Sequence, residues 1–505
     1  MAPAAETATT ADEGGGKRTN LQSGGLALAF AKLFFLIAGY AISIVLTRLV
    51  PPETFGLYGV ISMVIAVPNM VLIQTVLFTV SRPLAAEITK GLGSYRVLRR
   101  RGFRLGLVLG GLVTLVFLAG AEPLAVRFLR DPDLIGPLRA VAAIPLIYAL
   151  YAVNIGTLNA TRRFGMQAAL DIVMAASKAS LIIGAAAIGL GLAEILGGFT
   201  LAAGVALVLS VVLVRVARPP GVATAPAPSV IPPMTAFAGS LLLFTAVVNL
   251  LLASDLLLLK RFVVTAADEA AVGFYTSANL VARVPYSLMN AVSLMMFPLV
   301  ATLHALEDAP RLRRYVAETA KVTALLLCLL SGVAAAASGE IQRLLFPAAY
   351  GAVASELKLM VWGFSGYSFA VTCAWILNST ERSRIAVGLV LVPLIAVGIA
   401  ATLLVPGGAT MGAATAVAIA GAAAAAASLG ILHRVFRAHL QPLFILKLAA
   451  AIAATELLGR AWAAEGKIMI LAKLSALTIV FVGVILASRA VTIAEVKELR
   501  RARTH

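Results

Sequence analysis

Long apolar blocks alternate with short polar segments over almost the whole chain. Most blocks hold about twenty residues, the length that an α-helix needs to cross the hydrocarbon core of a bilayer. Membrane-spanning β-strands would instead give shorter segments of alternating polarity. The pattern predicts an all-α, polytopic membrane protein with about 14 transmembrane helices. The predicted spans cover residues 26–49, 56–80, 103–121, 136–159, 168–190, 193–216, 236–259, 272–300, 316–338, 355–379, 385–405, 409–432, 441–459 and 468–488.

Composition agrees with this class and removes several others. Of the 505 residues, 61% are hydrophobic and 13% are charged, whereas about a quarter of a soluble domain is charged. Cys328 and Cys373 both lie in apolar blocks without a CxxC partner, and the four histidines show no ligand spacing. We therefore expect no disulfide, no metal site and no bound cofactor.

The net charge of +18 follows from topology rather than from nucleic-acid binding. Most of the 41 Lys and Arg residues lie in alternate polar segments, as the positive-inside rule produces. This distribution places both termini in the cytoplasm and requires an even number of spans. The basic loop from Arg96 to Arg104 fits the same rule, although it could also bind anionic membrane lipids or a synthase partner.

Two short motifs in the first half of the chain recur in the second half. Gly56-Leu57-Tyr58, followed by Val67-Pro68, recurs as Gly273-Phe274-Tyr275, followed by Val284-Pro285. The residues of the second match are Tyr148, Leu158, Asn159, Thr161 and Arg163, repeated as Tyr367, Leu377, Asn378, Thr380 and Arg382. Duplicated halves of six spans each would keep the same orientation and be related by a pseudo-two-fold axis along the membrane normal.

A Pro-rich segment marks the expected junction of the two halves, and the charge pattern marks the two tails. Spans thirteen and fourteen have no counterpart in the first half. The predicted divisions are a disordered tail at 1–20, a six-span lobe at 21–216, a linker at 217–233, a six-span lobe at 234–433, an additional two-span segment at 434–488 and a basic tail at 489–505.

Several short stretches carry a family resemblance. They are Thr47-Arg48-Leu49-Val50-Pro51-Pro52-Glu53-Thr54-Phe55-Gly56-Leu57-Tyr58, Leu158-Asn159-Ala160-Thr161-Arg162-Arg163-Phe164-Gly165, Val272-Gly273-Phe274-Tyr275 and Phe297-Pro298. With the layout of the spans, they resemble the polysaccharide transport family of lipid-linked oligosaccharide flippases. That family lies in the superfamily that also contains the lipid II flippases and the multidrug and toxin extrusion antiporters.

The resemblance implies two six-span lobes around a central cavity that opens alternately to either face of the bacterial inner membrane. The implied substrate is an undecaprenyl-diphosphate-linked oligosaccharide, and the implied partners include polymerase and glycosyltransferase machinery. The resemblance also implies that the protein works as a monomer and that H+, Na+ or the membrane potential drives transport. By analogy with the lipid II branch, residues 441–488 would help to form a groove for the lipid tail.

A sugar-diphosphate needs a polar, cationic path through hydrocarbon. In the eighth predicted span, polar residues recur at steps of three or four and share one helix face: Tyr275, Asn279, Arg283, Tyr286, Asn290 and Ser293. Arg283 falls near the midplane of the membrane. We expect it to face the cavity, the alternative being a structural arginine paired with a carboxylate or with backbone carbonyls.

Two further deep cations are Lys32 in the first span and Lys178 in the fifth. Both are cavity candidates, although Lys32 could reach the cytoplasmic surface and Lys178 could serve packing alone. Asp171 shares a helix face with Lys178 but lies about 10 Å away along the axis, too far for a direct pair. We interpret Asp171 as a boundary residue.

The second span offers Tyr58, Ser62 and Asn69 on the face that matches the eighth span. Ala66 stands there where Arg283 stands in the repeat, which predicts a cavity of unequal charge.

Pro68 and Pro285 are matched prolines inside predicted helices. They are hinge candidates, or static bends that shape the packing. Arg48 is a candidate gate at the outer mouth, or an interfacial residue. Asp255 is a candidate coupling-ion carboxylate, the alternative being a boundary ion pair with the nearby Lys260 or Arg261.

Three functions therefore compete. The favoured one is a glycan-lipid flippase. A multidrug antiporter of the same superfamily would want a deep carboxylate, whereas the deep charges here are mostly basic. A membrane glycan polymerase or glycosyltransferase would need catalytic carboxylates in a large loop, and the short loops here contain no Asp-x-Asp cluster.

Overall fold

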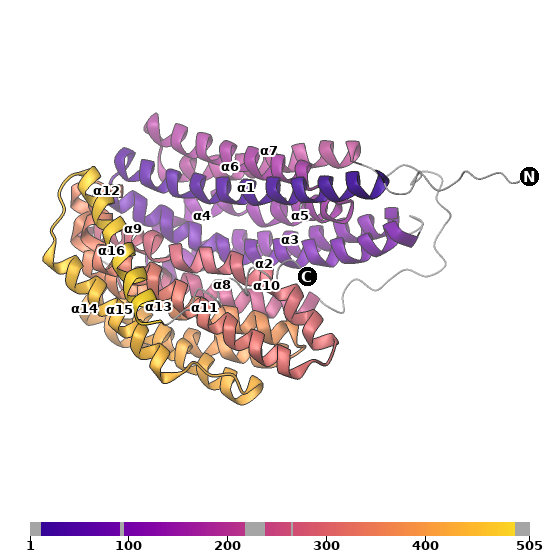
Figure 1. Ribbon diagram of the computed structural model, residues 1–505. Coiled ribbons are helices and arrows are strands. Elements are labelled where there is room, and N and C mark those ends of the chain that lie inside the picture. Colours follow the sequence, from indigo (N-terminus) through magenta and orange to yellow (C-terminus); the bar gives the residue numbers. More distant parts are fainter. Residues whose placement is uncertain (1–11, 91–94, 218–237, 264–265, 490–505) are drawn as a thin grey trace, which may run out of the picture. The chain divides into compact units, whose positions relative to one another are not determined.

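A computed structural model describes residues 12–90, 95–217, 238–263 and 266–489, and every element in these ranges is helical (Figure 1). The α-helices are α1 (Asp12–Leu49), α2 (Pro52–Lys90), α3 (Tyr95–Pro123), α4 (Ile135–Val141), α5 (Ile144–Ala160), α6 (Phe164–Ala187), α7 (Leu192–Val216), α8 (Ala238–Phe262), α9 (Ala266–Ala282), α10 (Val284–Ala305), α11 (Ala309–Ala336), α12 (Ser338–Leu345), α13 (Ala354–Ser379), α14 (Ser383–Phe436), α15 (Pro442–Ala461) and α16 (Lys467–Ala487). A π-helix at Leu124–Phe128 and 3₁₀ turns at Pro132–Leu134 and Ala348–Val353 complete the set.

Twelve helical segments within the described ranges are long and apolar enough to cross a bilayer. The chain is therefore a multi-pass, all-α membrane protein, as predicted. Two predicted spans, 385–405 and 409–432, lie within α14, and the predicted span 272–300 is divided between α9 and α10. The total of fourteen spans and their arrangement in six-span lobes stay predictions.

The chain forms two compact units. The first comprises residues 1–49 and 64–246, and the second comprises residues 50–63 and 247–505. Helix α1 begins at Asp12, inside the predicted tail 1–20, so residues 12–20 are helical. The predicted linker 217–233 beyond Ala217 and the basic tail beyond Arg489 lie outside the described residues.

In each unit, the helix that carries the second repeated motif is the most enclosed one. Helix α5 packs against α3, α6 and α7, and its buried residues point in every direction around the helix. Helix α13 packs against α9, α10, α11 and α14 and is buried in the same way. A helix that is hydrophobic all round belongs in a core. The matched tyrosines Tyr148 and Tyr367 are both buried within these helices.

The ends of these two helices adopt the same turn. Arg162 and Glu381 have left-handed φ values of 55° and 60°. The amide of Arg163 donates to Leu158 O at 2.9 Å, and the amide of Arg382 donates to Leu377 O at the same distance. The hydroxyls of the matched Thr161 and Thr380 donate to the last helical carbonyls. The sequence repeat is therefore also a repeat of backbone conformation.

The first repeated motif contacts its own copy within the second unit. A Cβ atom built on Gly56 would lie 2.7 Å from the amide nitrogen of Gly273. A Cβ built on Gly273 would lie 2.0 Å from the carbonyl oxygen of Pro52, and one built on Gly59 would lie 2.5 Å from Thr276 Cγ2. Small residues permit such close approach of two helix backbones. The two matched glycines are thus required by one helix crossing.

Helix α14 reverses direction within its length. A Cβ built on Gly412 would lie 2.2 Å from Leu404 O, whereas eight residues of straight helix would separate these positions by about 12 Å. The reversal occurs at Ala409, whose φ of 42° and ψ of −119° are not helical. Thr410 Oγ1, next to the reversal, donates to Glu356 Oε1 of α13 at 2.8 Å.

Replacing Ala409 with glycine is expected to stabilise the protein. Its φ and ψ match the first central position of a type II′ turn, which glycine occupies without steric cost. Ala409→Gly should raise the free energy of unfolding by about 1 kcal/mol, seen as a higher melting temperature of the purified protein. Ala409→Val should lower the melting temperature; a rise with valine would contradict this account.

One buried and one partly exposed ion pair attach the two C-terminal helices to the rest of the second unit. Lys473 Nζ of α16 lies 2.5 Å from Glu340 Oε1 of α12 and donates to Gly459 O at 2.8 Å, with the lysine side chain 1% exposed. Glu456 of α15 pairs with Lys358 of α13 and with Arg460.

Candidate functional site

The backbone breaks at Arg283, the residue that the sequence pattern singled out. Helix α9 ends at Ala282, Arg283 caps the N-terminus of α10, and Pro285 lies in the first turn of α10. Proline has no amide hydrogen and is tolerated in the first turn, where that hydrogen has no helical partner. Pro285 therefore marks a break between two helices, whereas the matched Pro68 lies inside the continuous helix α2. A hinge role for either proline stays a prediction.

The buried carboxylate of Asp255 accepts three partners from the neighbouring helix α9 and its end. Tyr275 Oη donates to Asp255 Oδ2 at 3.1 Å, and Asn279 Nδ2 donates to the same oxygen. Arg283 Nη2 lies 3.6 Å from Asp255 Oδ1. The Asp255 side chain is 2% exposed and that of Arg283 is 15% exposed. Asn279, Tyr275 and Arg283, predicted to share a helix face, thus meet at one carboxylate.

Arg283 makes three further contacts within the second unit. Its Nη2 donates to Leu252 O, and its Nη1 donates to Met63 Sδ at 3.1 Å. Its guanidinium lies over the ring of Phe364, 5.1 Å from the centroid. We call Met63, Asp255, Tyr275, Asn279, Arg283 and Phe364 the Arg283–Asp255 cluster.

The cluster is a nearly neutral, buried ion pair with spare hydrogen-bonding capacity. Within the described residues, Arg283 Nε and the hydroxyl of the nearby helix residue Tyr367 have no hydrogen-bond partner. A buried polar group without a partner is costly and is satisfied by ligand or water where one can reach it. Arg283 Nε and Tyr367 Oη are thus two polar groups of the site that the described chain leaves unused.

Asp255 has a partner that the sequence did not suggest, and its role as a coupling-ion carboxylate stays a prediction. A boundary ion pair with Lys260 or Arg261 was one alternative, but Lys260 Nζ lies 3.0 Å from Glu269 Oε1 and Asp255 pairs with Arg283. The sequence placed the lysine nearby along the chain but carried no signal for the longer-range partner. For Arg283, the contacts with a carboxylate and a carbonyl are those of the structural alternative.

The remaining residues of the predicted face are placed but not linked to Arg283. Tyr286 is buried and Asn290 half-buried on α10, while Tyr58 is buried and Ser62 half-buried on α2. Their role in a cavity stays a prediction.

The two deep lysines of the first unit have partners there. Lys32 Nζ lies 2.8 Å from Asp171 Oδ2, with the lysine side chain 60% exposed and the aspartate 9% exposed. Asp171 is therefore the partner of Lys32, which the spacing along one helix could not reveal. Lys178 Nζ lies 3.7 Å from the centre of the Phe199 ring, a cation–π contact.

Two other predicted residues, Asn69 and Arg48, lie in the first unit. Asn69 is buried on α2, and its Oδ1 has no hydrogen-bond partner in the part of the chain that is described. Arg48 is exposed and its Nη1 donates to Ile44 O at 3.0 Å. A gate at Arg48 stays a prediction.

Sequence reasoning missed Met63 and Phe364 as partners of Arg283. Both look like ordinary core residues in apolar blocks. Phe364 lies one helical turn before Tyr367, which belongs to a repeated motif, and this proximity was the only available signal. No group of three or more His, Cys, Asp or Glu able to hold a metal occurs in the described ranges.

A family model described as "Polysaccharide biosynthesis protein" matches residues 45–351, more than half of the chain. The chain belongs to the polysaccharide biosynthesis protein family. Both copies of the glycine motif lie inside the matched region of this family member, as do all residues of the Arg283–Asp255 cluster except Phe364. No curated protein matches the chain.

Solved structures show which fold this polysaccharide biosynthesis protein has. Lipid II flippase MurJ in an inward closed conformation is 14% identical, with a TM-score of 0.68 over 91% of this chain and 98% of MurJ. A multidrug resistance MATE family transporter in an inward-facing conformation is 14% identical, with a TM-score of 0.66 over 80% of this chain and 94% of that one. A MOP superfamily transporter from Pyrococcus furiosus Vc1 is 13% identical, with a TM-score of 0.56 over 83% and 95%.

These neighbours are transporters and flippases rather than enzymes. The resemblance inferred from short motifs is thereby confirmed at the level of family and fold.

Proposed function

We propose that the protein is a flippase that moves an undecaprenyl-diphosphate-linked oligosaccharide from the inner to the outer leaflet of the bacterial inner membrane by alternating access. The observation that carries the proposal is the match of residues 45–351 to a polysaccharide biosynthesis family on a flippase and transporter fold. The chemistry of the buried cluster is compatible with it, because Arg283 offers a guanidinium donor to a diphosphate.

We also propose a topology, an oligomeric state and partners for the protein. It places both termini in the cytoplasm and the working protein as a monomer, with polymerase and glycosyltransferase machinery as partners. Transport would draw on H+, Na+ or the membrane potential, since a flippase makes and breaks no bond that could supply energy.

A cation-coupled multidrug antiporter is the second candidate, supported by the buried carboxylate Asp255 on a MATE-like fold. The pairing of Asp255 with Arg283 counts against it, because the carboxylate already holds a cationic partner. A lipid II flippase is a third member of the same class. A glycan polymerase has no support from the family or from the fold.

Loss of the protein is expected to leave the lipid-linked oligosaccharide on the cytoplasmic leaflet and to remove the corresponding surface glycan. Proteoliposomes that contain the purified full-length chain should transfer a fluorescent undecaprenyl-diphosphate oligosaccharide between leaflets, measured by its accessibility to an external quencher. Protein-free liposomes provide the baseline.

Accumulation of cationic dyes by these proteoliposomes, together with unchanged surface glycan in cells that lack the protein, would instead identify a drug antiporter. Transfer of lipid II at the same rate as the oligosaccharide lipid would instead identify the peptidoglycan precursor as a substrate.

A further inference from the structure

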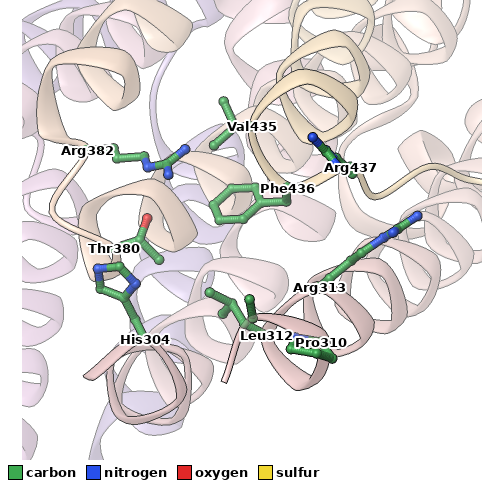
Figure 2. Close-up of a pocket in the computed structure, with 10 residues that line it drawn as sticks. His304, Pro310, Leu312, Arg313, Thr380, Arg382, Val435, Phe436 and Arg437 are labelled. Carbon is green, nitrogen blue, oxygen red and sulfur yellow. The ribbon is translucent and has the colours of Figure 1, made fainter. Parts of the chain in front are cut away.

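A basic pocket of about 740 Å³ lies in the second unit, away from the Arg283–Asp255 cluster (Figure 2). It is bordered by the end of α10, the first turn of α11, the turn between α13 and α14, and the end of α14. Its basic residues are Arg313, Arg382, Arg437 and His304, and no acidic residue is among those that line it. The charge distribution predicts that this end of the helices faces the cytoplasm.

Within the described part of the chain, the basic side chains at this pocket differ from their neighbours in forming no ion pair. On α11, Arg311 pairs with Asp308 at 3.3 Å and Arg314 with Glu318 at 2.8 Å. Arg313, between them, lines the pocket and forms no ion pair with any described residue. Three arginines from separate elements, Arg313, Arg382 and Arg437, thus line one pocket.

Two of these arginines lie at helix ends that contain a left-handed residue. Arg437 ends α14 with a left-handed φ of 52°, a conformation that usually falls to glycine or asparagine. The Arg382 guanidinium lies over the Phe436 ring, 5.7 Å from its centroid, and follows the repeated turn at Glu381.

The remaining lining is largely apolar. Leu312, Val435 and Phe436 line the pocket beside the arginines, as Figure 2 shows. Arginine forks match phosphate oxygens through paired N–H donors, while the apolar part would suit the first carbons of a lipid tail. The apolar lining would contribute no binding free energy to a soluble anion.

We propose that this pocket binds the phosphate-bearing headgroup of a lipid. Two lipids share that chemistry: a polyprenyl diphosphate and an anionic glycerophospholipid. The inference goes beyond the proposed function, since it concerns a separate site and holds whatever molecule the protein translocates.

The test measures binding to the purified full-length protein in detergent micelles by native mass spectrometry. The probes are undecaprenyl diphosphate, phosphatidylglycerol and inorganic pyrophosphate. The variant Arg313→Gln/Arg382→Gln/Arg437→Asn keeps a residue that tolerates the left-handed conformation at position 437. We expect it to bind at least one of the two lipids roughly tenfold more weakly or worse, because each charge-assisted hydrogen bond to phosphate contributes about that factor.

The matched control is Arg163→Gln/Arg311→Gln/Arg314→Gln. It removes the same charge, and Arg163 occupies in the first unit the turn position that Arg382 occupies in the second. The control should bind both lipids as the wild type does, and melting temperatures should show that both variants are folded. Should the triple variant unfold, Arg382→Gln alone against Arg163→Gln gives the same comparison.

The two lipid arms identify the source of the headgroup. Loss of undecaprenyl diphosphate binding alone would assign the pocket to the polyprenyl lipid, and loss of phosphatidylglycerol binding alone would assign it to the bilayer. The assignment of this pocket would be contradicted if the folded variant bound both lipids as the wild type does. It would also be contradicted if the control lost as much lipid binding as the variant. Pyrophosphate binding as tight as that of the lipids would overturn its lipid character.

Discussion

Arg283→Met is expected to abolish glycan export and to lower the stability of the protein together. Removing the guanidinium leaves Asp255 as an uncompensated buried charge, since its side chain is 2% exposed. Breaking a buried ion pair from one side costs about 3–5 kcal/mol. The measurements are surface glycan in cells, leaflet transfer in proteoliposomes, and the melting temperature of the purified variant.

A second substitution separates the two effects. In Arg283→Met/Asp255→Asn no buried charge is left alone, and the asparagine oxygen can still accept from Tyr275 and Asn279. We expect the double variant to regain most of the lost stability and to remain inactive in export. Export at the wild-type level by the double variant would show that Arg283 serves the fold alone and that the substrate site lies elsewhere.

Gly273→Ala is expected to destabilise the protein more than the addition of a methyl group at any other helix contact of α9. The new Cβ would lie 2.0 Å from Pro52 O, a backbone atom that cannot rotate away. Overpacking of this kind costs about 1–3 kcal/mol, and the rigid partner favours the upper end. The variant should melt at a markedly lower temperature and accumulate poorly in the membrane.

The matched control is Gly388→Ala, which makes the same change in a helix of the same unit where a Cβ would meet nothing within 4 Å. Alanine is a better helix former than glycine by about 1 kcal/mol, so this variant should melt at or slightly above the wild-type temperature. Equal melting temperatures for the two variants would show that α2 and α9 can move apart at no cost.

Much of the fold could be predicted because membrane helices follow from local sequence. The apolar blocks predicted helices, and Pro285 announced an irregularity in the span 272–300. The break at Arg283 follows from the missing proline amide. The reversal within α14 was also predicted, as the boundary between the spans 385–405 and 409–432, although the left-handed φ falls on Ala409 and not on the neighbouring Gly407 or Gly408.

Partners of the charged residues could not be predicted from the same patterns. Helical periodicity placed Arg283 on a polar face of its helix. Periodicity within one helix does not show which residue of a neighbouring helix lies against that face. For Asp255 the only ion-pair partners considered were Lys260 and Arg261, and Asp171 was left without Lys32, because each observed pair joins residues of different helices. Predicting them requires the packing of the helices, which no single sequence supplies.

The buried pair between Lys473 and Glu340 has a consequence for motion. Sliding α16 past α12 would separate two charges with little water to receive either, at a cost of several kcal/mol. The carbonyl of Gly459 adds a third point of attachment to the same ammonium group. Helix α16 is therefore expected to move together with α12 as a rigid body. We expect the C-terminal helices to follow the conformational change of the second unit and not to move independently within it.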